Sequence, residues 1–252
     1  MTTNHRHYLN LAFKIAETNL GKTKLNPAVG TIIVKNNTVI STGVTSINGR
    51  PHAEFNALKN INSAKNADLY TTLEPCTHFG KTPPCVSIIN KKKIKHVYYS
   101  FDDPDKRTHK KAKNILKKKN IKVNKIKSTN FKDFYRSYFF NKKYNLPFVS
   151  AKIAISKDYY SINNKSKWIT NSHSQKVTHL LRSKHDCIFS TSKSINKDNS
   201  LLNCRIDGLN YLKPDLFIID LELNLKKKLS LNNIIKKRKT FLIIKFENKK
   251  KI

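Results

Sequence analysis

The sequence contains no apolar run long enough to cross a bilayer, which takes about 20 consecutive apolar residues in a helix. Its first residues do not have the apolar core of a signal peptide. Cysteine is scarce, with 4 residues in 252, and this excludes the dense disulfide framework of a small secreted domain. We therefore expect a cytoplasmic protein without a membrane partner, in which Cys187 and Cys204 are buried free thiols.

Acidic residues are also few. Asp and Glu number 16 against 50 Lys and Arg, so the formal net charge is +34. Such an excess is typical of proteins that bind nucleic acid or a membrane surface. Here, however, arginine is scarce and the lysines occur in short runs along the whole chain, for example at 91–93, 117–119 and 249–251. This distribution favours a compositional bias of exposed positions, and we expect no nucleic-acid partner.

Two short motifs carry the clearest chemistry. The first is His-Ala-Glu at 52–54, and the second is Glu-Pro-Cys at 74–76, followed by Cys85. One imidazole and two thiols can hold Zn²⁺ with three protein ligands and leave a fourth position for water, as in catalytic zinc sites. A structural zinc site is instead closed by four ligands. We therefore predict that His52, Cys76 and Cys85 bind zinc.

Glu54 supplies the carboxylate that hydrolysis at such a site needs. It follows His52 by two positions at the start of an expected helix, so its carboxylate can lie beside the metal without ligating it. Zinc lowers the pKa of its water to about 7, and a nearby carboxylate can pass that proton to a leaving amine. A single histidine or cysteine is more often a packed core residue. The combination is nevertheless the zinc-deaminase pattern, and we predict Glu54 as a catalytic residue.

The apolar pattern of the first half predicts alternating helices and strands. Helices are expected at 5–20, from 52 onward, at 86–90 and at 108–119, and strands at 31–34, 39–44, 69–73, 97–100 and 121–126. In the helix that begins at His52, the residues expected to face inward are Phe55, Ala57, Leu58 and Ile61. This αββαβαβαβ order predicts a mixed sheet with helices on both faces and the metal at the carboxyl ends of strands.

The remainder of the chain predicts a second α/β domain. Residues 131–144 have the pattern of an aromatic-rich helix that packs on the sheet or bridges to a second domain. Asn-Leu-Pro at 145–147 ends this helix, so the predicted domains are 1–145 and 146–252. In the second domain we expect strands at 148–155, 187–189, 216–219 and 240–244, and a helix at 172–182.

The first half resembles the deaminase domain of the bifunctional riboflavin-biosynthesis deaminase/reductase family. The resemblance rests on Asn-Pro-Ala-Val-Gly at 26–30, Pro-His-Ala-Glu at 51–54 and the run Thr-Leu-Glu-Pro-Cys-Thr-His-Phe-Gly-Lys-Thr-Pro-Pro-Cys at 72–85. The spacing of the two cysteines is the discriminating detail. Residues 77–84 separate them, whereas nucleic-acid deaminases of the same superfold usually have Pro-Cys-x-x-Cys.

This resemblance implies a cytidine-deaminase-like fold and a zinc-dependent hydrolytic deamination. The implied substrate is a small molecule, a diaminopyrimidinone carrying a ribosyl 5'-phosphate, with substrate contacts from Asn26, Lys81, Thr82 and Asp105. Two positions depart from the family pattern. Asp105 stands where the family has asparagine, and Thr45 stands where it usually has a substrate-facing histidine.

The second half resembles the reductase domain of the same family, which has a dihydrofolate-reductase-like α/β fold. The matching runs are 146–158, Ser-Lys-Trp-Ile-Thr at 166–170, Leu-Arg at 181–182 and 198–205. The resemblance implies NADP contacts from Ala154, Trp168, Thr170, Ser194 and Asp198. It implies substrate contacts from Lys152, Ser166, Arg182, Leu202 and Arg205.

Glycine is nearly missing from this second half. Gly208 is the one glycine after Gly80, so the glycine turn at which the family's cofactor phosphates approach a helix has no counterpart. We therefore expect an incomplete reductase-like domain in which NADPH binding is in doubt. The sequence leaves open whether another chain completes this domain and whether the protein forms a homo-oligomer.

Two other functions compete with the deaminase of riboflavin biosynthesis. The charge of +34 would suit a nucleic-acid base deaminase, for which RNA binding should depend steeply on salt. A non-catalytic basic binding module would keep the fold without needing Glu54. The presence of Glu54 beside a full set of ligands favours an enzyme.

Overall fold

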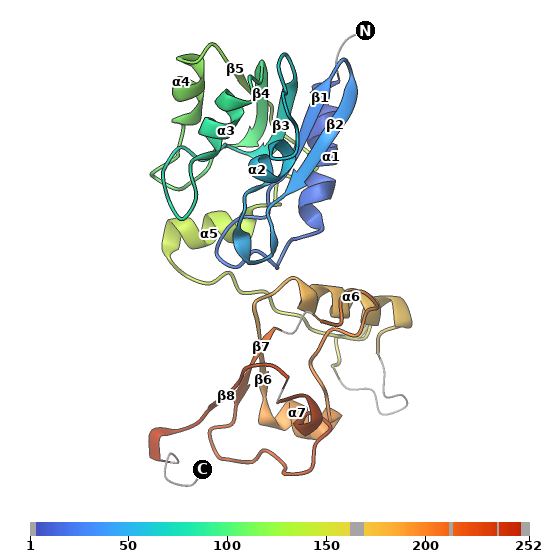
Figure 1. Ribbon diagram of the computed structural model, residues 1–252. Coiled ribbons are helices and arrows are strands. Elements are labelled where there is room, and N and C mark those ends of the chain that lie inside the picture. Colours follow the sequence, from blue (N-terminus) through green and yellow to red (C-terminus); the bar gives the residue numbers. More distant parts are fainter. Residues whose placement is uncertain (1–3, 162–168, 212–213, 236, 248–252) are drawn as a thin grey trace. The chain divides into compact units, whose positions relative to one another are not determined.

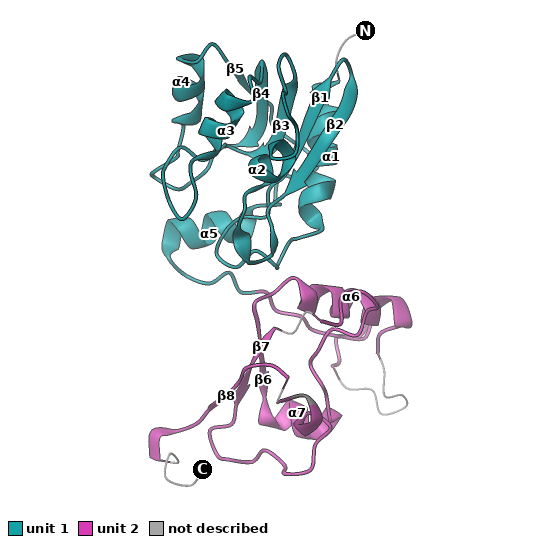
Figure 2. Cartoon of the chain, in the orientation of Figure 1, with its two compact units in different colours: residues 1–149 teal, residues 150–252 magenta. Residues whose placement is uncertain are grey.

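The computed structural model describes residues 4–161, 169–211, 214–235 and 237–247. The chain divides into two compact units, residues 1–149 (unit 1) and 150–252 (unit 2), as Figures 1 and 2 show. The division falls at Val149, slightly beyond the boundary that the sequence predicts after Asn145. None of the helices in the described ranges combines the length and apolarity that crossing a bilayer requires.

Unit 1 contains a mixed five-stranded sheet. Its helices are α1 (His5–Glu17), α2 (Ala53–Leu58), α3 (Cys85–Lys91), α4 (Ala112–Lys117) and α5 (Arg136–Tyr144), with the 3-10 helix η1 (Ile47–Gly49) before α2. Its strands are β1 (Gly30–Lys35), β2 (Thr38–Val44), β3 (Asp68–Leu73), β4 (His96–Phe101) and β5 (Lys122–Lys125). The strand order is β2-β1-β3-β4-β5, with β1 antiparallel to β2 and β3, and β3, β4 and β5 parallel. The predicted mixed α/β fold is confirmed.

Alternate residues of the strands supply the two faces of this sheet. Ile33, Leu69 and Val97 join the core formed with α2, α3 and α4. Their neighbours Ile32 and Tyr70 point the other way and pack with α1. This follows from the two-residue period of a strand, and the near-continuous apolar runs are those of strands buried on both faces. Figure 1 shows the helices on the two sides of the sheet.

The aromatic segment that ends unit 1 anchors α5. Phe131 stacks on Phe13 of α1 with ring centroids 4.5 Å apart. Tyr135 is buried, and its hydroxyl donates a hydrogen bond to the Ala28 carbonyl oxygen at 3.1 Å. The helix was expected to start at residue 131. It begins at Arg136, and Tyr135 is its N-cap. These contacts fix where α5 leaves the core.

Unit 2 contains a three-stranded parallel sheet in the order β6-β7-β8. Its elements are α6 (Ser172–Ser183), β6 (Cys187–Thr191), α7 (Ser192–Asp198), β7 (Asp215–Ile219), α8 (Asn232–Ile235) and β8 (Thr240–Ile243). Leu216 and Ile218 of β7 pack against Ile195 of α7 in its main core. Cys204 is buried as expected, whereas Cys187 is only half-buried. The predicted α/β class holds for this unit too.

Two local predictions are wrong. Phe55 does not face inward, because its side chain is 42% exposed. Helix α2 is short, and the face that it buries is formed by Ala53, Glu54, Ala57 and Leu58. At about 100° per residue, Phe55 lies outside that face.

The strand predicted at 148–155 is not formed. Its alternating pattern places Val149, Ile153 and Ile155 on one side, but all three are exposed, and none of these residues pairs with a described strand. Alternation favours a strand only where a neighbouring strand supplies hydrogen bonds, and the sheet of unit 2 pairs β6, β7 and β8 alone among the described residues.

Candidate metal centre and its cavity

Segments that leave the carboxyl ends of two strands bring the predicted metal ligands together. His52 is the N-cap of α2, which follows β2 through η1. Cys76 comes shortly after the end of β3, and Cys85 is the first residue of α3. Gly43 of β2 allows α2 to lie close to the sheet, because a Cβ at this position would stand 2.3 Å from the Ala53 carbonyl oxygen.

The ligand atoms form a compact cluster. His52 Nδ1 lies 3.5 Å from Cys76 Sγ and 3.4 Å from Cys85 Sγ, and the three ligand atoms all lie within 4.8 Å of one another. Both thiols are buried and His52 is half-buried. Two sulfurs and one imidazole nitrogen are a donor set that suits Zn²⁺ and leaves one tetrahedral position open. The residues present therefore fit a zinc ion.

Glu54 lies directly beside this cluster. Its Oε2 accepts a hydrogen bond from Cys85 Sγ at 3.4 Å, and the residue is 3% exposed. Burial, reinforced by the charge of Cys76, raises the pKa of the Glu54 carboxyl to about 7. At neutral pH this carboxyl can therefore both take up and release a proton.

The cysteines and the histidine adjust one another's protonation. The hydrogen bond with Cys85 lowers the pKa of the Cys76 thiol to about 4, and the Cys85 backbone N–H also donates to Cys76 Sγ at 3.2 Å. The same pairing raises the pKa of the Cys85 thiol. Burial acts to lower the pKa of His52, but the hydrogen bond with Cys76 and the charge of Glu54 outweigh it and raise that pKa. Cys76 is thus prepared as a thiolate ligand.

Glu74 has a structural function that the sequence did not reveal. Its Oε2 accepts hydrogen bonds from the backbone N–H groups of Asp103 at 3.2 Å and Lys110 at 2.9 Å, and its Oε1 accepts one from Ala112 at 3.0 Å. Burial raises the pKa of this carboxyl, although the three backbone donors oppose the shift. Glu74 therefore ties the loop after β4 to the end of β3, immediately before Cys76.

The cluster opens into a cavity at the carboxyl ends of the strands. His52, Glu54 and Cys76 line this cavity. Of the residues that the resemblance implies for binding substrate in unit 1, Asn26 and Asp105 line it, whereas Lys81 and Thr82 do not. Lys81 is exposed, and Thr82 Oγ1 accepts a hydrogen bond from the Arg50 guanidinium. Thr45 also lines the cavity, and its Oγ1 accepts a hydrogen bond from the Val29 N–H at 3.0 Å.

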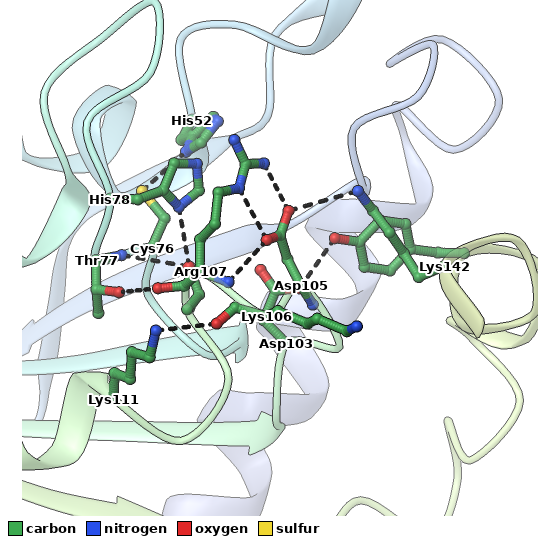
Figure 3. A network of polar contacts seen from close by, with 12 residues as sticks. His52, Cys76, Thr77, His78, Asp103, Asp105, Lys106, Arg107, Lys111 and Lys142 are labelled. Carbon is green, nitrogen blue, oxygen red and sulfur yellow. Dashed lines mark hydrogen bonds and ion pairs between the residues drawn. The ribbon is translucent and has the colours of Figure 1, made fainter. Parts of the chain in front are cut away.

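Sequence reasoning missed several other side chains of the cavity wall. These are Arg50, His78, Arg107, Tyr138 and Lys142. Arg107 and Lys142 both reach the carboxylate of Asp105, as Figure 3 shows. Proximity in sequence could have indicated Arg107, but no local pattern links Lys142, on α5, to the loop after β4.

In unit 2, the structure brings together only some of the residues predicted for the reductase. Arg182 Nη1 and Arg205 Nη1 donate to the carbonyl and side-chain oxygens of Asn203 at 3.1 and 2.9 Å, next to Leu202. Ser194 and Asp198 lie on α7, and Thr170 precedes α6. Lys152 and Ala154 lie in the segment that forms no strand, and Ser166 and Trp168 fall outside the described residues.

Comparison with known proteins identifies relatives of the chain. Residues 2–101 match the family model of the cytidine and deoxycytidylate deaminase zinc-binding region. The riboflavin biosynthesis proteins RibD of Bacillus amyloliquefaciens, Aquifex aeolicus and Buchnera aphidicola are 33%, 32% and 37% identical to the chain. The alignments cover 79%, 97% and 79% of this chain and 55%, 69% and 54% of those proteins. The chain therefore spans just over half the length of two of these relatives and about two thirds of the third.

Solved structures of two proteins are also similar to the chain. Form 2 of Acinetobacter baumannii RibD is similar with a TM-score of 0.82 and 27% identity, over 96% of this chain and 70% of that one. A Thermotoga maritima diaminohydroxyphosphoribosylaminopyrimidine deaminase/5-amino-6-(5-phosphoribosylamino)uracil reductase is similar with a TM-score of 0.84 and 26% identity, over the same shares. Both similarities extend across the two units.

Proposed function

The chain belongs to the family of the riboflavin biosynthesis protein RibD, and on this basis we propose that unit 1 is a zinc-dependent deaminase. The substrate that we propose is a diaminopyrimidinone carrying a ribosyl 5'-phosphate, the class of compound for which the Thermotoga maritima relative is named. The observation that supports this proposal most directly is the cluster of His52, Cys76 and Cys85 with Glu54 Oε2 3.4 Å from Cys85 Sγ.

The metal would be held by His52, Cys76 and Cys85, whose ligand atoms lie within 4.8 Å of one another. When bound, zinc lowers the pKa of a water molecule to about 7 and so supplies a nucleophile at neutral pH. The lowered pKa of Cys76 favours the thiolate form of this ligand, and so metal binding over its protonation.

In this proposal Glu54 moves the proton. Its Oε2 takes a proton from the attacking water, whose oxygen forms the new C–O bond to the ring carbon. The same carboxyl then returns the proton to the ring amine, the C–N bond breaks, and ammonia leaves. Water is consumed, and the amine is replaced by oxygen. A carboxyl pKa raised to about 7 by burial suits both steps at neutral pH.

Ammonia release tests the proposal directly. The purified, zinc-loaded chain should release ammonia from the diaminopyrimidinone ribosyl 5'-phosphate in a coupled glutamate dehydrogenase assay. The expected control is little or no release from cytidine or from dCMP. A chain that holds zinc but releases no ammonia from the phosphorylated diaminopyrimidinone would contradict the proposed activity.

For unit 2 we propose that this chain does not form an NADPH site unaided. Gly208, the one glycine of this unit, lies in an exposed turn with φ of 76°, and a Cβ added there would meet no atom within 4 Å. It therefore does not provide the close backbone approach that cofactor phosphates use at a glycine turn. Titration with NADPH, followed by its fluorescence, should show no saturable binding, and a tight complex would overturn this proposal.

A further inference from the structure

Part of the cavity wall comes from residues that follow the metal-ligand motifs in the chain. The match to the zinc-binding deaminase region ends at residue 101. Asp103, Asp105 and Arg107 follow this region in the loop after β4, and Tyr138 and Lys142 come from α5, yet all five line the same cavity as His52 and Glu54. These residues can therefore contact the part of the substrate that differs from the substrates of other deaminases.

Two cations of this wall converge on one carboxylate. Arg107 Nε lies 2.9 Å from Asp105 Oδ1 and Arg107 Nη2 lies 2.6 Å from Oδ2, which is the two-point geometry of a guanidinium on a carboxylate. Lys142 Nζ approaches the same Oδ2 at 3.5 Å. The Asp105 side chain is only 13% exposed, whereas that of Arg107 is 61% exposed. Figure 3 shows both cations reaching Asp105 from different elements.

The two cations of this wall have donors that Asp105 does not use. The wall also contains the carboxylate of Asp103, whose Oδ1 accepts hydrogen bonds from the Asp105 N–H and the Tyr138 hydroxyl, both at 2.9 Å, so the two cations are balanced by two acids. Among the described residues, Arg107 Nη1 has no hydrogen-bond partner. Lys142 Nζ keeps further protons that its long contact with Asp105 does not use. A phosphate is tetrahedral, but two of its oxygens can accept hydrogen bonds from one edge of a guanidinium, as the two oxygens of a carboxylate do.

We propose that Arg107 and Lys142 bind the phosphate of the substrate and that Asp105 is the positioning residue that holds both cations at the cavity wall. This inference rests on the proposed function, since it assigns the recognition of the substrate's anionic end to named residues. It also differs from the expectation raised by the resemblance, which includes Lys81 and Thr82 among the substrate contacts. Lys81 is exposed and lies outside the cavity lining.

The loop that carries Arg107 is tied to the loop that carries Cys76. Thr77 Oγ1 donates to the Arg107 carbonyl oxygen at 3.0 Å, and the Thr77 N–H donates to Thr108 Oγ1 at 3.4 Å. Thr108 Oγ1 also lies 3.1 Å from His78 Nδ1. A phosphate on Arg107 would therefore be held in register with the metal ligands, which orients the ring toward Glu54.

Binding of ribose 5-phosphate tests the inference without requiring turnover. Isothermal titration of the zinc-loaded full chain should show binding that weakens about tenfold or more in Arg107→Ala and in Lys142→Ala. The matched control is Lys106→Ala, which removes one exposed positive charge next to Arg107 but outside the cavity lining. It should leave the affinity unchanged and so accounts for the general attraction of a chain with net charge +34.

Removal of Arg107 also uncovers the Asp105 carboxylate, which would itself repel an anion. The double variant Asp105→Asn, Arg107→Ala separates the two effects, because it removes both charges. Weak binding in this variant supports a direct role of the guanidinium, whereas recovery to the wild-type affinity overturns it. Lys142→Ala, from another element, remains informative if the loop of Arg107 loses its conformation.

Kinetics give a second readout. In Arg107→Ala, KM for the phosphorylated diaminopyrimidinone should rise about tenfold or more, whereas KM for the dephosphorylated ribosyl analogue should change little. If the wild type releases ammonia but Lys81→Ala, and not Arg107→Ala, raises KM, the phosphate lies on the loop between the cysteines and the inference is overturned. If the wild type binds ribose 5-phosphate but releases no ammonia, the proposed function fails and the anion site stands.

Discussion

The carboxylate of Glu54 and the sulfur of Cys85 lie 3.4 Å apart, although 31 residues separate them in the chain. The contact joins the first turn of α2 to the first residue of α3, and it places a buried carboxyl against the metal-ligand cluster. Glu54 is therefore adjacent to the proposed metal site without being needed to complete a set of three ligands. This arrangement separates the consequences of losing Glu54 from those of losing Cys85.

Glu54→Gln should abolish ammonia release while zinc stays bound. The amide keeps the shape of the side chain but cannot carry the proton, and general acid–base catalysis typically contributes about 10²–10⁴-fold in rate. We expect turnover to fall by at least about 100-fold, with the zinc content of the purified variant measured by mass spectrometry. Glu17→Gln on the surface of α1 is the matched control. Loss of zinc from Glu54→Gln would show that Glu54 acts in metal binding.

Cys85→Ser should lose zinc. A thiolate ligand is replaced by a hydroxyl, which is a far weaker zinc ligand, and the remaining His52 and Cys76 leave an open site. We expect a substoichiometric zinc content after dialysis, compared with a full complement in the wild type. Cys187→Ser, on β6 of unit 2, removes a half-buried thiol elsewhere and should keep its zinc. Equal zinc contents in Cys85→Ser and the wild type would refute the assignment.

Glu74→Ala should destabilise unit 1 strongly. Two buried backbone N–H groups, those of Asp103 and Ala112, and the part-buried N–H of Lys110 would lose their acceptor. Because unsatisfied buried donors are costly, we expect the free energy of unfolding to fall on the order of 3 kcal/mol. Urea titrations followed by circular dichroism measure this change. Glu17→Ala, which breaks only an exposed pair with Lys14, should cost less than about 0.5 kcal/mol.

The contribution of Asp105 to stability should disappear in acid. The hydrogen bond from Arg107 holds the pKa of the Asp105 carboxyl well below its usual range. A carboxyl with a depressed folded-state pKa stabilises the fold above its unfolded pKa of about 3.9, and this contribution is lost as the pH falls below that value. In urea titrations, we expect the free energy of unfolding of the wild type to exceed that of Asp105→Asn by roughly 1 kcal/mol at pH 7. The difference should be smaller near pH 3. A difference that grows in acid would contradict this assignment.

Local patterns were enough to predict much of the fold of unit 1. The apolar alternation at β1 and β3 reflects burial on both sheet faces, and Gly, Pro and Asn mark the ends of elements, so the order of helices and strands could be written from the sequence. The second half was less predictable. The alternation over 148–155 satisfies the same local rule, yet the segment forms no strand because a strand also needs a partner that the local sequence does not specify.

The candidate site, too, could be predicted only in part from the sequence. His52, Glu54, Cys76 and Cys85 could be singled out from the chain alone, because zinc chemistry restricts the residue types and their positions at helix starts are local features. The cavity wall could not. Lys142 meets Asp105 across 37 residues, and Glu74 finds its donors 29 to 38 residues away. Such contacts depend on how β4, α4 and α5 pack, so the residue types predicted the chemistry, and the packing of these elements placed the residues that line the cavity.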